Sequence, residues 1–444
     1  MVKKLKTHHV WALGVGIVLV GEFMGWNSSV KLGGTKAAFI GIPIAAVMYL
    51  MIVLMTSEMA CAIPESGGQY SMAKYLLGPV GAFNIGLMMV LQYAMLEAAD
   101  ALVVGQLLKA IIPGINPLPF LFLSVLALTY LNYRGTYASL SVNFIITLTA
   151  FCGVIVLLFS TRFFNPSTSL IRLQQLSNGL PLGKLGIFAA LQFSCWFFLG
   201  IEGTAMVTSE CENPKKTLPR GAIIGLATLL IGGIITLFVC SGLIPAEKLS
   251  NSVYPLYEAA NATKQPFVIG FLFVGTMLSC IASANGCIGD AARSWYVMSR
   301  DGMLPKIFGE VHPKYHSPYK ALIFLAPVSI IFATTGMLDQ IVTFSIFSAL
   351  MVYFLTCIMM IRFRKLYPIE KIKRGFVCPG YPFIPYLCLA IICCILFGMF
   401  LNYSTSMIAI TIFYIGASIW FIKRRENDVD INHIQNTELG YQEN

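Results

Sequence analysis

The chain has 444 residues, of which 57% are hydrophobic and only 11% are charged. This composition excludes a soluble globular protein, because too few polar side chains are present to cover a water-exposed surface, and it indicates an all-α polytopic membrane protein. The net charge of +10 can be explained by basic loops beside the membrane, so we expect the lipid bilayer and no nucleic acid as a partner.

Apolar runs long enough to cross a bilayer as a helix predict 12 transmembrane helices. They lie at about 10–31, 37–60, 81–112, 117–133, 139–161, 185–207, 221–243, 266–291, 320–337, 340–361, 382–402 and 405–422. Most of the 30 Lys and Arg residues fall in loops on the side of the N-terminus. The positive-inside rule therefore places both termini in the cytoplasm. We expect the plasma membrane as the location. The polar segment 423–444 is predicted to be a disordered cytoplasmic tail.

The first span is interrupted by the stretch GEFMGWN, residues 21–27. Two glycines, Gly21 and Gly25, flank a carboxylate and precede Trp26 and Asn27 within an otherwise apolar helix. Broken helices at the membrane midplane are typical of secondary transporters, where their ends face the solute. The alternative is that the two glycines form only a close-packing helix face. That alternative leaves Glu22 and Asn27 unexplained.

The third span carries Glu97 and Asp100, which an i, i+3 spacing places on one helix face. Each would cost about 2.5–3.5 kcal/mol at the bilayer centre if it were ionised and faced lipid. We therefore expect the two carboxyl groups to point into the bundle, to be protonated, or to do so in combination. Glu97 is a candidate substrate-binding residue, and the alternative is a structural pair that bonds neighbouring helices.

The sixth span repeats the pattern of the first, since Gly200 and Gly203 flank Glu202 in the stretch WFFLGIEG. Spans one and six each begin a set of five, and two sets of odd length insert in opposite orientations. This predicts a 5+5 inverted repeat with broken helices 1 and 6. The repeats would cover 10–161 and 185–363 of a single transporter domain, 1–444, with two additional helices at 382–422. Those two helices could serve packing or a homodimer.

Several inner-loop stretches carry a family resemblance. They include SGGQYSMAKYLLGPVGAF after span two, SECENPKKTLPR after span six and SRDGMLP after span eight. These stretches resemble amino acid permeases of the amino acid–polyamine–organocation (APC) superfamily over about 10–425, which implies the leucine-transporter-like fold. GEFMGWN departs from the family's usual G-S-G ending and is similar to the corresponding stretch of the ethanolamine permease branch. The residue at position 97, Glu97, differs from that branch. Ala150 occupies the position of a lysine found in some members.

These observations predict a secondary active transporter that moves amino acids or a related small amine by alternating access, by proton coupling or exchange. The predicted substrate-binding residues are Gly21, Glu22, Gly25, Trp26, Asn27, Glu97, Trp196, Gly200 and Gly203. Proton coupling is assigned to Glu202 and, second, to Glu22, because burial disfavours the charged form of a carboxyl group. The aromatic ring of Trp196 suits an ammonium group.

The sequence leaves two alternatives open. An ethanolamine permease is favoured by the four mid-span carboxylates and by Asn27 as a partner for a hydroxyl. A non-transporting permease-like receptor is the alternative of another class, although the tail adds no signalling domain. An enzyme is not expected, because no nucleophile–base spacing occurs. Neither a cofactor nor a metal is expected, since the 12 cysteines include no CxxC pair.

Overall fold

The computed structural model describes residues 5–63, 65, 67–112, 114–160, 185–370 and 374–426. Within these residues the regular structure is helical, apart from an isolated bridge between Leu5 and Cys211. The helices are α1 (Thr7–Val18), α2 (Val20–Phe23), α3 (Asn27–Ala62), α4 (Gln69–Leu76), α5 (Gly78–Ile111), α6 (Leu118–Tyr133), α7 (Thr136–Phe159), α9 (Gly186–Ser194), η3 (Cys195–Phe197), η4 (Ile201–Glu210), α10 (Pro214–Leu243), α11 (Ala246–Ser250), α12 (Pro255–Ala262), α13 (Pro266–Arg300), η5 (Lys306–Gly309), α14 (Tyr319–Thr334), α15 (Leu338–Leu366) and α16 (Phe383–Glu426).

The helices confirm a membrane protein that crosses the bilayer several times. Eight helical segments of the described chain are long and apolar enough to span, and three shorter apolar helices accompany them. The shorter ones contain α1 with α2, α6 and α14. The two last predicted spans fall within α16, which bends at Tyr403 and continues through Glu426, past the predicted end at 422. The number of spans stays a prediction.

The first predicted interruption is present as a break in the backbone. The helical turn α2 ends at Phe23, and Met24 is extended, with φ of −157°. Gly25 follows with φ of +85°, a conformation that only glycine adopts without strain. Helix α3 then starts at Asn27 and bends at Gly34. The glycine at position 25 therefore allows the chain to leave one helix and enter the next inside the apolar layer.

The second interruption has a different form. Helix α9 ends at Ser194 and tightens into the 3₁₀ turn η3. Gly200 then takes φ of +111°, and the chain continues as a ten-residue 3₁₀ segment, η4. Because 3₁₀ runs longer than three or four residues are uncommon, η4 indicates a functional hinge or a sequence under strain.

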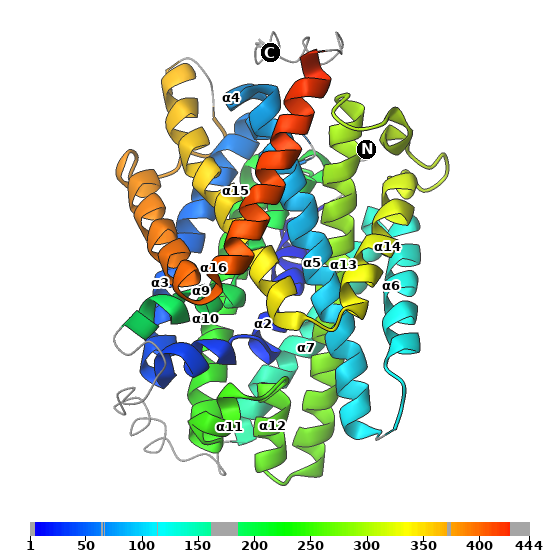
Figure 1. The fold of residues 1–444 in the computed structure, drawn as a ribbon, viewed down its shortest axis with the longest axis vertical. Helices are drawn as coiled ribbons and strands as arrows, with labels where there is room; N and C mark the ends of the chain where they lie inside the picture. The colour runs from blue at the N-terminus through cyan, green and yellow to red at the C-terminus, as the bar shows by residue number, and fades with distance from the viewer. Residues whose placement is uncertain are drawn as a thin grey trace.

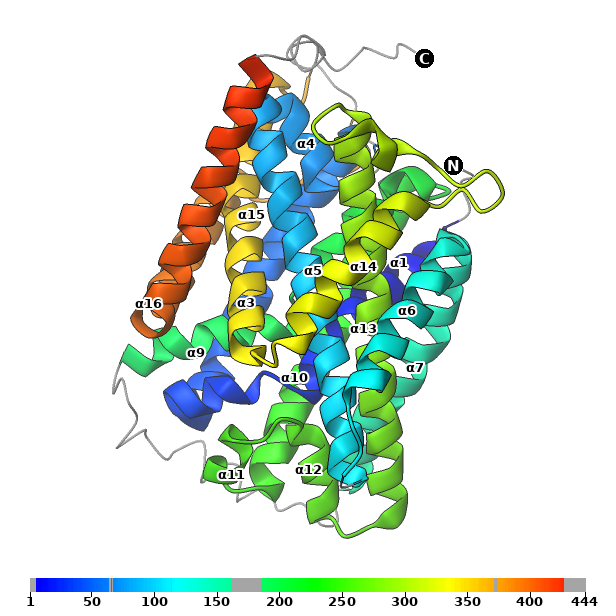
Figure 2. The same cartoon turned by 45° about the vertical axis from the view of Figure 1, so that its right-hand side comes forward.

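The broken helices lie together inside the bundle. Helix α1 packs against α10, α7 and η4, and α2 packs against η3 and α13. The long helix α5 packs against α13, α14 and α15. Figures 1 and 2 show α4 and the last turns of α16 at one end of the molecule, and α11 and α12 at the opposite end. We call these the α4 end and the α11 end.

Buried ion pairs join the helices at the α4 end. The fully buried carboxylate of Glu58, in the last turns of α3, accepts hydrogen bonds from Arg364 of α15 at 2.7 Å, from Arg374 and from the backbone N–H of Cys378 at 2.7 Å. Both guanidinium groups are almost completely buried. A single carboxylate therefore holds α3, α15 and the segment before α16 together.

Candidate functional site

Gly21 and Gly25 bring the first broken helix into direct contact with Trp196. A Cβ atom at Gly21 would lie 2.4 Å from the carbonyl oxygen of Trp196, and one at Gly25 would lie 2.6 Å from its Nε1. The two glycines therefore form a close-packing face, as the alternative interpretation held. The face packs on the other broken helix rather than on an unrelated one, and Nε1 of Trp196 has no hydrogen-bond partner among the described residues.

Ile17 makes the reciprocal contact. Its side chain fills the space beside the glycines of the second break, where a Cβ at Gly200 would lie 2.4 Å from its Cγ2 and one at Gly203 would lie 3.3 Å from its Cδ1. Each broken helix thus presents glycines to a bulky residue of the other. This arrangement accounts for Gly21, Gly25 and Gly200 by close approach of the two broken helices, whereas the atom nearest to a Cβ at Gly203 is Oδ2 of Asp290 in α13.

Gly200→Ala is expected to destabilise the protein by at least about 2 kcal/mol, since positive φ costs a non-glycine residue about 1–3 kcal/mol and overpacking adds a similar amount. Thermal unfolding in detergent measures the change. Gly302→Ala is the matched control, because Gly302 has φ of +78° but nothing within 4 Å of its Cβ position. Equal losses for the two variants would contradict the role of the contact with Ile17.

Glu202 is buried and held from several sides. Its Oε1 accepts a hydrogen bond from Nε2 of Gln92 at 2.6 Å and a long one, 3.5 Å, from the hydroxyl of Tyr93. Its Oε2 accepts the backbone N–H of Gly200 at 3.1 Å. The carboxyl group therefore caps the start of η4 and connects the break to α5. Any change in its charge acts directly on the conformation of the broken helix.

Glu22 lies apart from Glu202. Its side chain is fully buried and points towards α10, where a Cβ at Gly232 would lie 3.2 Å from its Oε1 and where Thr236 faces it. Neither carboxyl oxygen has a hydrogen-bond partner at normal distance among the described residues. The two carboxylates predicted for proton coupling therefore contact different helices, Glu22 facing α10 and Glu202 reaching α5.

Trp26 and Asn27 are both engaged by the protein itself. Nε1 of Trp26 donates to the carbonyl of Glu22 at 3.1 Å, and its ring stacks on Phe197 at 5.8 Å. Nδ2 of Asn27 donates to the carbonyls of Leu249 at 2.9 Å and Ser252 at 2.8 Å. The amide group thus links the start of α3 to helix α11 and to the loop that follows it.

Glu97 and Asp100 face neighbouring helices. Oε2 of Glu97 accepts a hydrogen bond from the hydroxyl of Ser329 in α14 at 2.7 Å. Asp100 is directed towards Ser283 of α13, and neither of its oxygens has a hydrogen-bond partner among the described residues. The structure therefore joins Glu97 to α14, whereas Gly21, Gly25 and Trp196 meet at the breaks.

A cavity of about 240 Å³ borders the first break on its α11 side, and we call it the break cavity. The junction of α2 and α3, Trp196, the loop after α11 and the start of α15 line it. Two charged side chains, Lys31 and Asp339, are among the lining residues. The cavity is slightly smaller than the roughly 300–1,000 Å³ typical of sites for drug-sized ligands, which suits a small solute.

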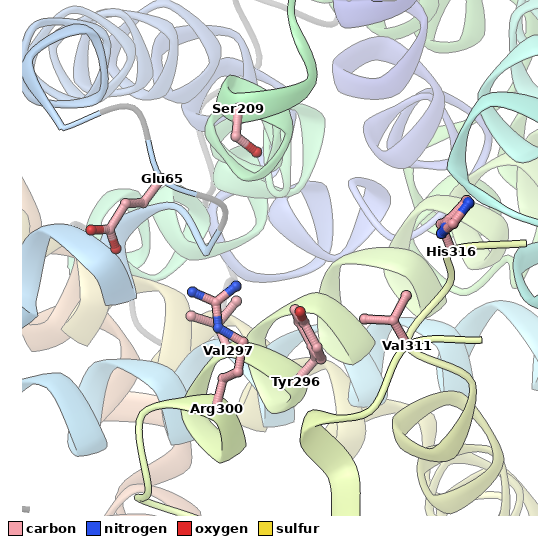
Figure 3. A pocket seen from close by; sticks show the side chains of 7 residues that line it. All are labelled: Glu65, Ser209, Tyr296, Val297, Arg300, Val311 and His316. Carbon is pink, nitrogen blue, oxygen red and sulfur yellow. The ribbon is translucent and has the colours of Figure 1, made fainter. Parts of the chain in front are cut away.

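A second cavity of about 480 Å³ lies towards the α4 end, and we call it the loop cavity. Its lining residues are Glu65, Ser209, Tyr296, Val297, Arg300, Val311 and His316. Figure 3 shows Ser209 across the cavity from Tyr296 and Arg300, with Glu65 and His316 on opposite sides. Because η4 begins at the break and carries Ser209 in its last turn, this one segment connects the break to the loop cavity.

Ionic contacts close the bundle around the loop cavity. Lys74 of α4 pairs with Glu65 at 3.1 Å and with Asp301 at 3.3 Å, and the hydroxyl of Tyr70 donates to Asp301 at 2.8 Å. Burial and the nearby carboxylate of Asp301 raise the pKa of the Tyr70 hydroxyl, so it remains a hydrogen-bond donor at neutral pH. These contacts tie α4 to the segment after α13.

Sequence reasoning missed the polar partners of the second break. Gln92 and Tyr93 of α5 reach Glu202. The Oδ2 atom of Asp290 in α13 lies 2.2 Å from the position that a Cβ at Gly203 would take. Gln92 is a polar residue inside an apolar run and could have been noticed for that reason. Within the described residues no group of three or more His, Cys, Asp or Glu side chains is arranged to hold a metal ion.

Comparisons with known proteins agree with this architecture. The profile of the Amino acid permease family matches residues 8–424. An uncharacterized transporter of Rhizobium meliloti is 44% identical over 96% of this chain and 92% of its own length. The branched-chain amino acid permease BcaP of Bacillus subtilis is 26% identical over 96% and 94%, and the gamma-aminobutyric acid permease of Escherichia coli is 24% identical over 89% and 88%. Two interrupted membrane helices in mutual contact and a family match over nearly the whole chain lead to one conclusion: the chain belongs to the amino acid permease family of the APC superfamily.

Proposed function

We propose that the protein is a secondary active transporter that moves amino acids across the plasma membrane by alternating access. The observation that carries the proposal is the contact of two broken helices, Gly21 and Gly25 against Trp196, beside the break cavity. A second cavity, the loop cavity, lies towards the α4 end, where η4 reaches it from the second break through Ser209. Alternating access needs a site that can open to either side, and helix breaks allow the half-helices to move separately.

The proposed architecture is twelve spans arranged as a 5+5 inverted repeat. The order of elements supports it, because the segments from α1 to α7 supply five apolar helices that begin with a break, and those from α9 to α15 supply five more. The two arms of α16 follow as additional helices. In this arrangement the repeats cover 10–161 and 185–363.

A zwitterionic amino acid fits the break cavity better than ethanolamine. Lys31 and Asp339 among the lining residues offer partners for a carboxylate and an ammonium group, and the unpaired indole N–H of Trp196 is a further donor. Asn27 is the predicted hydrogen-bond partner for the hydroxyl of ethanolamine. Its amide group donates instead to the carbonyls of Leu249 in α11 and of Ser252 after it. Amino acids are therefore the proposed substrate class.

Counterflow into proteoliposomes tests the proposal. Liposomes that contain the purified protein are preloaded with one unlabelled amino acid at a time, and uptake of the same labelled amino acid is measured, with ethanolamine in the same panel. We expect exchange of at least one amino acid and a loss of it in Trp196→Ala. Exchange of ethanolamine alone would overturn the substrate class. Binding without exchange of any solute would favour the permease-like receptor.

The proposed topology places the α4 end in the cytoplasm with both termini. Single cysteines at Lys248 and Lys365 test it in a chain whose 12 native cysteines are replaced. Both positions are exposed, Lys248 in α11 and Lys365 in the last turn of α15. An impermeant maleimide added to intact cells should label the cysteine at 248 and leave that at 365 unlabelled until the cells are opened. The reverse pattern would invert the topology.

A further inference from the structure

A second polar site lies outside the two cavities, where α5 packs against α13 and α14. It is formed by Glu97 and Asp100 of α5, Ser283 of α13 and Ser329 of α14, and all four side chains are almost completely buried. We propose that this group, the α5 acidic site, binds a proton during transport, separately from Glu202. The inference rests on the proposed transport function and extends it.

The α5 acidic site has more hydrogen-bonding groups than partners. The hydroxyl of Ser329 satisfies one oxygen of Glu97, but the other oxygen of Glu97 and both oxygens of Asp100 have no partner among the described residues. The hydroxyl of Ser283 faces Asp100 but has no hydrogen-bond partner at normal distance among the described residues. Buried polar groups are normally paired, so unpaired ones at one place indicate a site that holds an additional donor.

Among the described residues, no basic side chain balances the charge of this site. No ion pair reaches either carboxyl group from a described Lys, Arg or His, and the groups that interact with them are hydroxyls and each other. The titratable groups that face the site are the thiols Cys280 and Cys287 of α13, and α14 contributes only the hydroxyl of Ser329. Two carboxylates cannot remain ionised together in an apolar layer without a cation, because the desolvation cost is several kcal/mol for each ion. The smallest cation that removes this cost is a proton.

The position of the site links it to the breaks. Along α13, Cys287 lies within electrostatic reach of Asp100 on one side and of Asp290 on the other. Asp290 in turn borders Gly203 and interacts with Tyr93 and Glu202. A proton gained or lost at Asp100 therefore changes the field along the α5–α13 contact that leads to the second break. The site also depends on the contact between α5 and α14, because the hydroxyl of Ser329 in α14 donates a hydrogen bond to Glu97 in α5.

The variants Asp100→Asn and Glu97→Gln test the site, and the exposed Glu310→Gln is the control. Proton and substrate binding are linked reciprocally, with coupling factors of about 5 or more. We expect the difference in KM for counterflow between acidic and alkaline buffer to shrink about fivefold or more in Asp100→Asn. The infrared band of protonated carboxyl groups should decrease in both variants. Asp100→Glu keeps a titratable group and should therefore retain the dependence on pH. This variant provides the test if Asp100→Asn folds poorly.

Three outcomes would overturn the proposal. They are an unchanged infrared band in both variants, an unchanged dependence of KM on pH, and stimulation by a sodium gradient that Asp100→Asn abolishes. The infrared measurement needs no substrate. If no solute is exchanged at all, the transport function fails while the band still reports whether the α5 acidic site holds a proton.

Discussion

Replacing Glu202 by glutamine is expected to abolish accumulation of substrate driven by a proton gradient, while exchange of labelled for unlabelled substrate continues. Glu202 bonds the N–H of Gly200 at the start of η4 and reaches α5 through Gln92. Loss or gain of its proton changes the strength of both contacts, because hydrogen bonds to an ionised group are roughly twice as strong as neutral ones. A glutamine keeps the shape of the side chain and cannot titrate.

The variant should remain folded. The amide oxygen of a glutamine at 202 can still accept the N–H of Gly200, and its NH₂ group can face the carbonyl oxygen of Gln92 after a flip of that amide. The expected loss of stability is about 1 kcal/mol, as for a single neutral hydrogen bond. Accumulation under an imposed pH gradient and counterflow are measured on the same proteoliposomes, with the exposed Glu310→Gln as control. Unchanged accumulation in Glu202→Gln would remove this residue from coupling and would favour sodium coupling or pure exchange.

The helices and the two breaks could be predicted from the sequence because glycine and charge inside apolar runs have few structural explanations. Gly25 and Gly200 do take positive φ, and Gly21 and Gly203 do lie at close contacts. The directions of the carboxylates could not be predicted. The spacing of Glu97 and Asp100 gives a shared face of α5, but only the tertiary packing shows that α13 and α14 cover it.

Asn27 illustrates the same limit at longer range. Its hydrogen-bond partners are carbonyls of Leu249 and Ser252, more than two hundred residues along the chain, and backbone acceptors leave no signature in the sequence. Gln92 and Glu202 likewise come from the two different predicted repeats, 110 residues apart in the chain. Residue types identified the candidate site, whereas their pairing depends on how the two sets of helices pack.

Removing the carboxylate of Glu58 is expected to be the most destabilising single change at the α4 end. Glu58→Ala leaves the buried guanidinium groups of Arg364 and Arg374 without their common partner and leaves the N–H of Cys378 unpaired. Loss of one partner of a buried ion pair costs about 3–5 kcal/mol, because the remaining charge is desolvated without compensation. Thermal unfolding of the purified protein in detergent measures the loss.

An exposed ion pair provides the control for Glu58. Glu310 and Lys320 form a solvent-exposed pair, and Glu310→Ala should cost only about 0–1 kcal/mol. Combining Glu58→Leu with Arg364→Met and Arg374→Met removes all the charges together and should recover most of the stability lost in Glu58→Ala, since well-packed apolar groups can replace a buried ionic cluster. If the triple variant is less stable than Glu58→Ala, the arginines stabilise the fold by contacts other than the ion pairs with Glu58. Those contacts would be the hydrogen bonds from Arg364 to the carbonyl of Cys378 and from Arg374 to the carbonyl of Tyr367. The guanidinium groups also lie over the rings of Tyr381 and Phe363, at 5.0 and 4.5 Å from the ring centres.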